Sequence, residues 1–239
     1  MHWDFALIFL FFATVVPLLG RRRVRALMKA AQTTSKERLA LYASTILFQW
    51  LATGIILWRT SSHGIRAADL GLVIPNRALV LVVSLLLSGL IFANQIFSLR
   101  RLAAHPDEAG AHGILPHMAR KVFPQNTAER WAFSALVLTV AFCEEVIYRG
   151  FAQYVFSTWP LRAVAAGVIG SAILFSVAHL YQGRRGLLST LIVGLLFSGI
   201  RLWTGSLVPP MLAHFVADIT AGFLAPIRLG VSKEAVARF

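Results

Sequence analysis

The stretch WAFSALVLTVAFCEEVIYRG, residues 131–150, places two adjacent glutamates, Glu144 and Glu145, at the end of an apolar run. The whole chain of 239 residues contains only ten acidic side chains. A charged side chain at the centre of a membrane helix costs about 2.5–3.5 kcal/mol on insertion scales, and such residues are usually functional. We therefore take this pair as the starting point for both fold and function.

Similar apolar runs recur along the rest of the chain. Of all residues, 57% are hydrophobic and only 14% are charged, which is well below the usual charged share. Several runs approach the roughly 20 residues that a helix needs to cross a bilayer. The sequence predicts an all-α, polytopic transmembrane bundle of about 7–8 helices, with the spans at residues 4–20, 39–58, 78–99, 131–149, 162–181, 186–202 and 207–225.

The net charge of +13 comes from cations that flank the apolar runs rather than from one basic patch. Arg21, Arg22, Arg23 and Arg25 directly follow the first run. Cations at helix ends meet anionic headgroups and mark cytoplasmic loops. We therefore expect a lipid bilayer and not nucleic acid as the partner, with loops 21–38 and 100–130 in the cytoplasm. The short loops favour the plasma membrane of a bacterium or archaeon.

Polar groups inside the apolar runs concentrate in the C-terminal part of the chain. We expect residues 1–130 to form a transmembrane scaffold and residues 131–239 to form the catalytic helical core, within one integral membrane domain. The polar cavity should then lie among the last four helices. The single cysteine, Cys143, is interpreted as a small buried apolar filler.

Helical spacing assigns different tasks to the two glutamates. Residues four apart share a helix face, so Glu145 and Arg149 are placed to pair. Glu144 points about 100° away from that face. We expect Arg149 to neutralise Glu145, which leaves Glu144 as the candidate base.

Two later runs supply histidines. A stripe at steps of four ends in His179 and should direct its side chain into the bundle; its earlier members are Ala163, Gly167, Ser171 and Phe175. His214 and Asp218 lie one turn apart on the last helix, where the aspartate can orient the imidazole or share a ligand.

The helix between these two histidines carries the small or polar residues Gly186, Thr190, Gly194 and Ser198 at steps of four. Small residues let membrane helices approach closely. We interpret it as a packing helix without a catalytic group.

Two chemistries fit a carboxylate with two histidines. Glu144, His179 and His214 can hold zinc or another divalent metal with a water in the fourth position. Without metal, Glu144 can take a proton from water while a histidine orients that water or donates to an oxyanion. Both predict a hydrolase in the membrane. A non-catalytic scaffold and a proton-coupled transporter are the alternatives.

Three motifs in this order resemble the CPBP family of intramembrane proteases, which includes the Rce1-type CAAX prenyl proteases and the Abi or bacteriocin-immunity proteins. EEVIYRG has the form EExxxR, FSVAH the form FxxxH and HFVAD the form HxxxN/D. RAADLGLVIP, before the third run, is similar to a short LGL element of that family. The three motifs cover roughly residues 131–225.

The resemblance implies about eight helices around a conical cavity, and an endopeptidase acting on a membrane-associated protein or peptide that is prenylated in the CAAX-type case. It implies that Glu144 and His179 activate water, that Arg149 holds Glu145, and that His214 with Asp218 stabilises the oxyanion. Members are often described as metalloproteases, and a metal-free glutamate mechanism is also argued. The prenyl proteases have asparagine where this chain has Asp218, so donation from a protonated carboxyl, orientation of His214 and metal binding all stay open for it.

Overall fold

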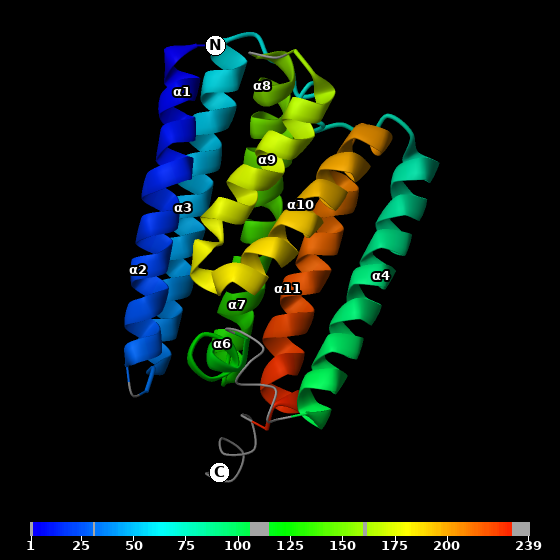
Figure 1. The fold of residues 1–239 in the computed structure, drawn as a ribbon. Helices are drawn as coiled ribbons and strands as arrows, with labels where there is room; N and C mark the ends of the chain where they lie inside the picture. The colour runs from blue at the N-terminus through cyan, green and yellow to red at the C-terminus, as the bar shows by residue number, and fades with distance from the viewer. Residues whose placement is uncertain (1, 31, 106–114, 160–161, 231–239) are drawn as a thin grey trace.

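The computed structural model describes residues 2–30, 32–105, 115–159 and 162–230, and its described elements are all helices (Figure 1). In chain order these are α1 (Trp3–Leu10), η1 (Phe11–Val15), α2 (Val16–Lys29), α3 (Ser35–Ser62), α4 (Arg77–Ala104), α6 (Leu115–Lys121), α7 (Thr127–Glu144), η2 (Glu145–Ala152), α8 (Gln153–Thr158), α9 (Val164–Ala178), η3 (Leu180–Gln182), α10 (Gly183–Thr204) and α11 (Val208–Arg228). Segments η1 and η2 are π-helical turns within longer helices, and η3 is a 3₁₀ turn.

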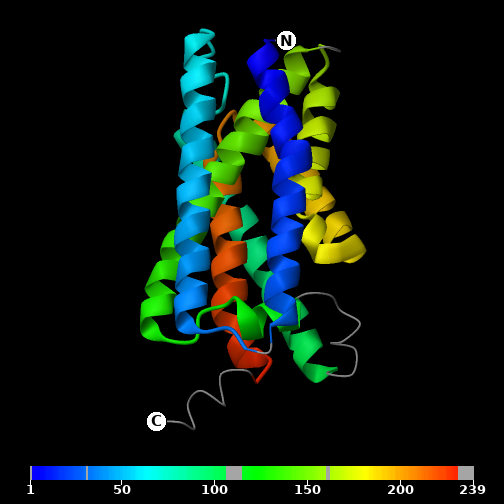
Figure 2. The same cartoon turned by 90° about the vertical axis from the view of Figure 1, so that its left-hand side faces the viewer.

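Six of the described helical segments are long and apolar enough to cross a membrane, which confirms the predicted polytopic bundle. They are Trp3–Lys29, Ser35–Ser62, Arg77–Ala104, Thr127–Thr158, Leu180–Thr204 and Val208–Arg228. Helix α9 is apolar but shorter. The N-terminal helix packs on α9, α3 packs on α7, and α4 packs on α11. Figure 2 shows the N-terminal helix and α3 as two separate flanks in front of the C-terminal helices.

Three helix ends differ from the predicted ones. The first helix continues to Lys29, so the basic cluster after the first apolar run lies on a helix. Helix α7 begins at Thr127, because the Asn126 side chain accepts a hydrogen bond from the Glu129 amide as an N-cap. Helix α9 ends at Ala178, three residues before the predicted end. Parts of the predicted cytoplasmic loop (residues 106–114) and of the predicted catalytic core (residues 160–161 and 231–239) lie outside the described residues.

A buried ion pair joins the start of α3 to the start of α7. Arg38 donates from Nε to Glu129 Oε2 at 2.8 Å and from Nη2 to Glu129 Oε1 at 3.0 Å. Glu129 also accepts from the Gln125 amide and from the Asn126 side chain. A buried carboxylate needs such partners to offset its desolvation, so this cluster fixes where α7 starts relative to α3.

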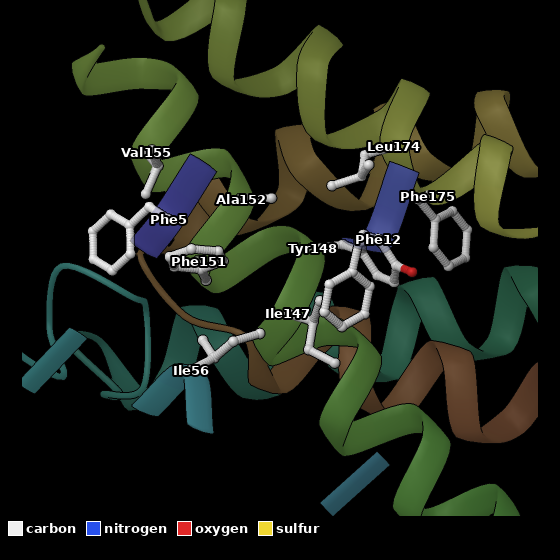
Figure 3. Close-up of a cluster of buried hydrophobic side chains, with 10 residues drawn as sticks. All are labelled: Phe5, Phe12, Ile56, Ile147, Tyr148, Phe151, Ala152, Val155, Leu174 and Phe175. Atoms are coloured by element: carbon white, nitrogen blue, oxygen red, sulfur yellow. The ribbon is translucent and has the colours of Figure 1, made fainter. Parts of the chain in front are cut away.

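An apolar cluster packs around η2 (Figure 3). Ile147, Tyr148, Phe151 and Ala152 of η2 are all buried. They pack with side chains from the N-terminal helix, α3, α8 and α9, namely Phe5, Phe12, Ile56, Val155, Leu174 and Phe175. The two predicted parts of the chain therefore share one core, and their division at residue 130 stays a prediction.

Leu70 and Gly71 of the LGL element pack between η2 and the turn that joins α10 to α11, and we call this contact the Leu70–Gly71 clamp. Leu70 is buried, and its carbonyl oxygen lies 3.2 Å from the point that a Cβ of Gly150 would occupy. Gly71 has φ +76° and accepts a hydrogen bond from the Leu207 amide at 2.9 Å. Arg201 donates to the Asp69 carbonyl at 2.5 Å. Glycine at 71 and at 150 permits this close approach of three backbone segments.

Replacing Gly71 with alanine should destabilise the fold. A Cβ there would meet Arg201 Nε at 3.1 Å and Leu207 Cγ at 3.4 Å, and a left-handed backbone costs a non-glycine residue about 1–2 kcal/mol. We expect Gly71→Ala to lower the midpoint of thermal unfolding in detergent micelles by several degrees.

Gly89→Ala is the matched control for that substitution. Gly89 lies within α4, and nothing lies within 4 Å of the Cβ position. Since alanine favours a helix over glycine, this variant should unfold at or above the wild-type temperature. Equal unfolding temperatures for Gly71→Ala and Gly89→Ala would contradict the clamp.

Candidate active site

A cavity of about 600 Å³ lies among α3, α4, α6, α7, α10 and α11. Its apolar lining includes Leu115, Met118, Val122, Phe123, Phe133 and Leu136. Its polar lining includes Glu144, His179, Tyr181, Arg185, His214 and Asp218. The cavity therefore extends from α6, which belongs to the segment predicted to be a cytoplasmic loop, to the carboxyl-terminal end of α7. Glu144 lies about 25 Å along the axis from the first residue of α7.

Four of the six predicted site residues line this cavity, and the other two lie behind its wall. Glu144, His179, His214 and Asp218 come from three different helical segments. Glu145 and Arg149 are fully buried and do not line the cavity. The structure thus brings the three motifs together, with the two glutamates on different sides of the wall.

Glu145 Oε1 accepts two hydrogen bonds. Arg149 Nη1 donates at 2.9 Å, as the spacing of four predicts. His214 Nδ1 lies 2.8 Å from the same oxygen. A carboxylate oxygen accepts, so His214 Nδ1 carries the donated proton. The guanidinium of Arg149 also lies over the Phe175 ring, 4.0 Å from its centroid. One carboxylate therefore fixes both a cation on its own helix and a histidine on α11.

Glu144 has a different environment. Gln49 Nε2, on α3, donates to Glu144 Oε1 at 3.0 Å. The second oxygen, Oε2, is buried and has no hydrogen-bond partner among the described residues. A buried acceptor without a partner is costly. Glu144 is therefore anchored through one oxygen, and the other can accept a proton.

His179 stands immediately after the last residue of α9, with φ −94° and ψ 20°. Its Nδ1 lies 2.9 Å from the Phe175 carbonyl oxygen. Because a carbonyl only accepts, Nδ1 donates, and in the neutral ring Nε2 is left as an acceptor. The predicted stripe thus ends in a histidine whose tautomer is fixed by its own helix.

Asp218 lies beside the other nitrogen of His214. The distance from His214 Nε2 to Asp218 Oδ2 is 3.6 Å, an ion-pair distance rather than a hydrogen bond. The Asp218 side chain is 42% exposed. Of the roles that stayed open, this arrangement is consistent with orientation of His214.

The side chains predicted to bind a metal were compared with the geometry of the site. Within the described ranges, no group of three or more His, Cys, Asp or Glu side chains is placed to hold a metal ion. His214 Nδ1 is bonded to Glu145 and His179 Nδ1 to a carbonyl. Glu144, His179 and His214 as ligands of zinc or another divalent metal stay a prediction.

No role was predicted from the sequence for Gln49, which donates to Glu144 Oε1 at 3.0 Å. Its signal was present, since a glutamine inside the apolar run of residues 39–58 is itself costly in a membrane. Gln95 of α4 and Thr45 of α3 also line the cavity. The expectation that the polar cavity belongs to the last four helices is therefore incomplete, because N-terminal helices supply part of its wall.

Residues 126–220 match the family model described as Type II CAAX prenyl endopeptidase Rce1-like, which confirms the resemblance that the motifs indicated. The chain is also 30% identical over 111 residues to the uncharacterized protein YpbD of Bacillus subtilis. That similarity covers 46% of this chain and 51% of YpbD, so the chain spans about half the length of this relative. No solved structure matches the chain.

Removing the arginine behind the cavity should destabilise the bundle. Arg149→Met leaves Glu145 as a buried carboxylate without its cation, which costs about 3–5 kcal/mol in comparable pairs. We expect a large fall in the unfolding midpoint in detergent and a partial recovery in the double variant Arg149→Met/Glu145→Gln. Arg130→Met, at an exposed position on α7, is the matched control. An Arg149→Met protein as stable as Arg130→Met would contradict this role.

Proposed function

We propose, from the match of residues 126–220 to the Rce1-like prenyl endopeptidase family, that this protein is an intramembrane endopeptidase that hydrolyses a peptide bond by glutamate-activated water. One observation carries the proposal. Glu144 has one oxygen anchored by Gln49, and its other oxygen is buried without a hydrogen-bond partner in the described part of the chain, in a cavity that His179 and His214 also line. The proposed location is the plasma membrane of a bacterium or archaeon.

The proposed reaction begins with water beside Glu144. The carboxylate takes one proton from the water, and the water oxygen forms a bond to the carbon of the scissile carbonyl. The carbonyl electron pair moves onto oxygen. When the carbon–nitrogen bond breaks, the leaving nitrogen receives the proton from Glu144, so that one water is consumed and an acid and an amine form. His179 Nε2, an acceptor in the neutral ring, is suited to orient the water.

The developing oxyanion needs a fixed donor. His214 is suited to that task because Glu145 holds its Nδ1 at 2.8 Å and thereby fixes the ring. Asp218, near Nε2, favours a proton on that nitrogen. Glu145 and Arg149 are then positioning residues rather than groups that touch the substrate, since both lie behind the cavity wall.

The cavity lining also supports the class of substrate. The apolar wall around Met118, Phe123 and Phe133 suits a segment that carries a lipid or apolar side chains. A CAAX box is the last four residues of a chain: a cysteine, which is prenylated, and the three residues that follow it. We therefore propose a membrane-associated protein, prenylated in the CAAX-type case, as the substrate.

Glu144→Gln should abolish cleavage while the protein still inserts and folds. General-base catalysis contributes about 10²–10⁴-fold to a rate, and an amide cannot take the proton. A peptide library that contains prenylated and unprenylated members identifies the peptides that the wild-type protein cleaves. For each of these peptides we expect the variant to lose at least a hundredfold in kcat. Glu37→Gln, at the exposed start of α3, is the control.

The same assay in the presence of a chelator tests for metal. A metal-free glutamate mechanism keeps its rate there, whereas loss of cleavage that added zinc restores would revise the mechanism toward a metal centre. Full cleavage by a purified Glu144→Gln protein would overturn the proposed role of Glu144. Wild-type protein that cleaves no library member would overturn the proposed function.

Gln49→Leu should lower kcat without a comparable change in KM. The substitution removes the donor to Glu144 Oε1. At metal sites, loss of the hydrogen bonds that orient the ligands typically costs about 10–100-fold in affinity or activity, and we expect a loss of that order in kcat here. The unfolding midpoint is measured alongside to separate positioning from stability. A variant that loses stability but keeps its kcat would show that Gln49 has only a structural role.

A further inference from the structure

Tyr181 belongs to the cavity wall but has no task in the reaction described above. It lies two residues after His179, in the turn η3 that joins α9 to α10, and its side chain lines the cavity. Its ring centroid lies 5.7 Å from that of the His179 imidazole. The carboxylates of Glu144 and Asp218 both act on it electrostatically. Tyr181 is therefore a neighbour of the groups that carry the proposed reaction.

The turn η3 holds Tyr181 in place. The His179 amide donates to the Ser176 carbonyl at 2.9 Å, and the Gln182 amide donates to the His179 carbonyl at 2.9 Å. Gly183 then starts α10 with a φ of +76°, a positive value that glycine adopts without strain. Helix α2 packs against η3. Because a tyrosine has only two side-chain torsions, the phenol on this closed turn has little freedom to move away from His179.

The hydroxyl of Tyr181 has a proton to donate. Its oxygen accepts a hydrogen bond from Gln182 Nε2 at 3.3 Å. A phenol also donates one hydrogen bond, and no acceptor in the described part of the chain takes that proton. Thr45, another hydroxyl of the lining, instead donates to the Leu41 carbonyl of its own helix at 2.8 Å. The Tyr181 proton is thus available to a molecule bound in the cavity.

The proposed reaction needs donors, whereas most polar groups around Glu144 are acceptors. Asp218 is a second carboxylate, and His179 has an acceptor at Nε2 because its Nδ1 donates to a carbonyl. His214 is the donor proposed above, but its Nε2 lies 3.6 Å from Asp218 Oδ2, so that carboxylate competes with the substrate oxygen for the proton. A neutral hydroxyl without such a competitor among the described residues supplies a fixed donor to the developing charge.

We propose that the Tyr181 hydroxyl is a catalytic donor to the oxyanion, beside His214. It donates a hydrogen bond to the oxygen of the scissile carbonyl. This bond strengthens as the water oxygen adds to the carbon and the carbonyl electron pair moves onto oxygen. The proton stays on Tyr181, and the carbonyl re-forms when the carbon–nitrogen bond breaks. The inference rests on the proposed function and adds a residue to its mechanism.

Binding separates this task from packing, because an oxyanion donor favours the transition state over the substrate. The first probe is a farnesylated peptide that ends in cysteine and three further residues, with a phosphonate in place of the peptide bond after the cysteine. Its tetrahedral, anionic group mimics the intermediate. The second probe is the unmodified peptide, bound by the Glu144→Gln protein so that it is not cleaved. Tyr181→Phe should weaken phosphonate binding about ten- to a hundredfold, as for a charge-assisted hydrogen bond, and leave peptide binding unchanged.

In the active protein, Tyr181→Phe should lower kcat about 10²–10³-fold, the usual effect of removing one oxyanion donor, with KM unchanged. Tyr154→Phe is the matched control, since Tyr154 of α8 packs against the apolar cluster around η2 and is outside the described lining of the cavity. This variant loses the same hydroxyl and should keep the wild-type kcat and phosphonate affinity. The unfolding midpoints of both variants should match that of the wild-type protein.

The two proposals fail separately. Phosphonate binding that Tyr181→Phe weakens no more than peptide binding, or an unchanged kcat in this variant, would overturn the role of Tyr181 and leave the endopeptidase intact. A wild-type protein that binds the phosphonate through Tyr181 but cleaves no peptide refutes the endopeptidase, while Tyr181 remains a donor to a bound anion. A wild-type protein that neither binds the phosphonate nor cleaves the peptide refutes both.

Discussion

The two hydrogen bonds accepted by Glu145 Oε1, from Arg149 and from His214, are the interaction on which the polar centre depends. A buried ion pair alone gives weak stability, because the desolvation of its charges offsets their attraction. Here the same oxygen also fixes the ring of a histidine on another helix. Losing Glu145 would leave Arg149 buried without a counter-ion and His214 without its orienting partner. The arrangement is better explained by the need to hold groups in place than by stability.

Around this pair, one set of residues holds η2 in place and another set lines the cavity. The apolar cluster and the Leu70–Gly71 clamp hold η2 from two sides, so that Glu145 faces α11. Glu144, one residue earlier, reaches the cavity and is held by Gln49 from α3. Adjacent residues can play different parts because each faces a different neighbour. The N-terminal helices therefore complete the site as well as the fold.

Much of this could be predicted from the sequence, since apolar runs give membrane helices and a spacing of four gives the Glu145–Arg149 pair. The motifs also indicated that His179, His214 and Asp218 gather near Glu144. Two contacts, as distinct from the residues that make them, could not be predicted, for a physical reason. Which nitrogen of His214 meets Glu145 depends on how α11 packs against η2, a contact over 69 residues of chain. The contribution of Gln49 likewise depends on α3 lying against α7, which no local pattern encodes.

The polar centre is arranged before any substrate binds, with His214 held by Glu145 and His179 left with an acceptor nitrogen. Nitrogen-15 NMR of histidine-labelled protein, assigned with His179→Asn and His214→Asn variants, reads the proton on each ring nitrogen directly. We expect a protonated Nδ1 in both rings, a bare Nε2 in His179, and a changed His214 signal in Glu145→Gln. A His179 protonated only on Nε2, or a His214 signal that does not respond to Glu145→Gln, would contradict the account.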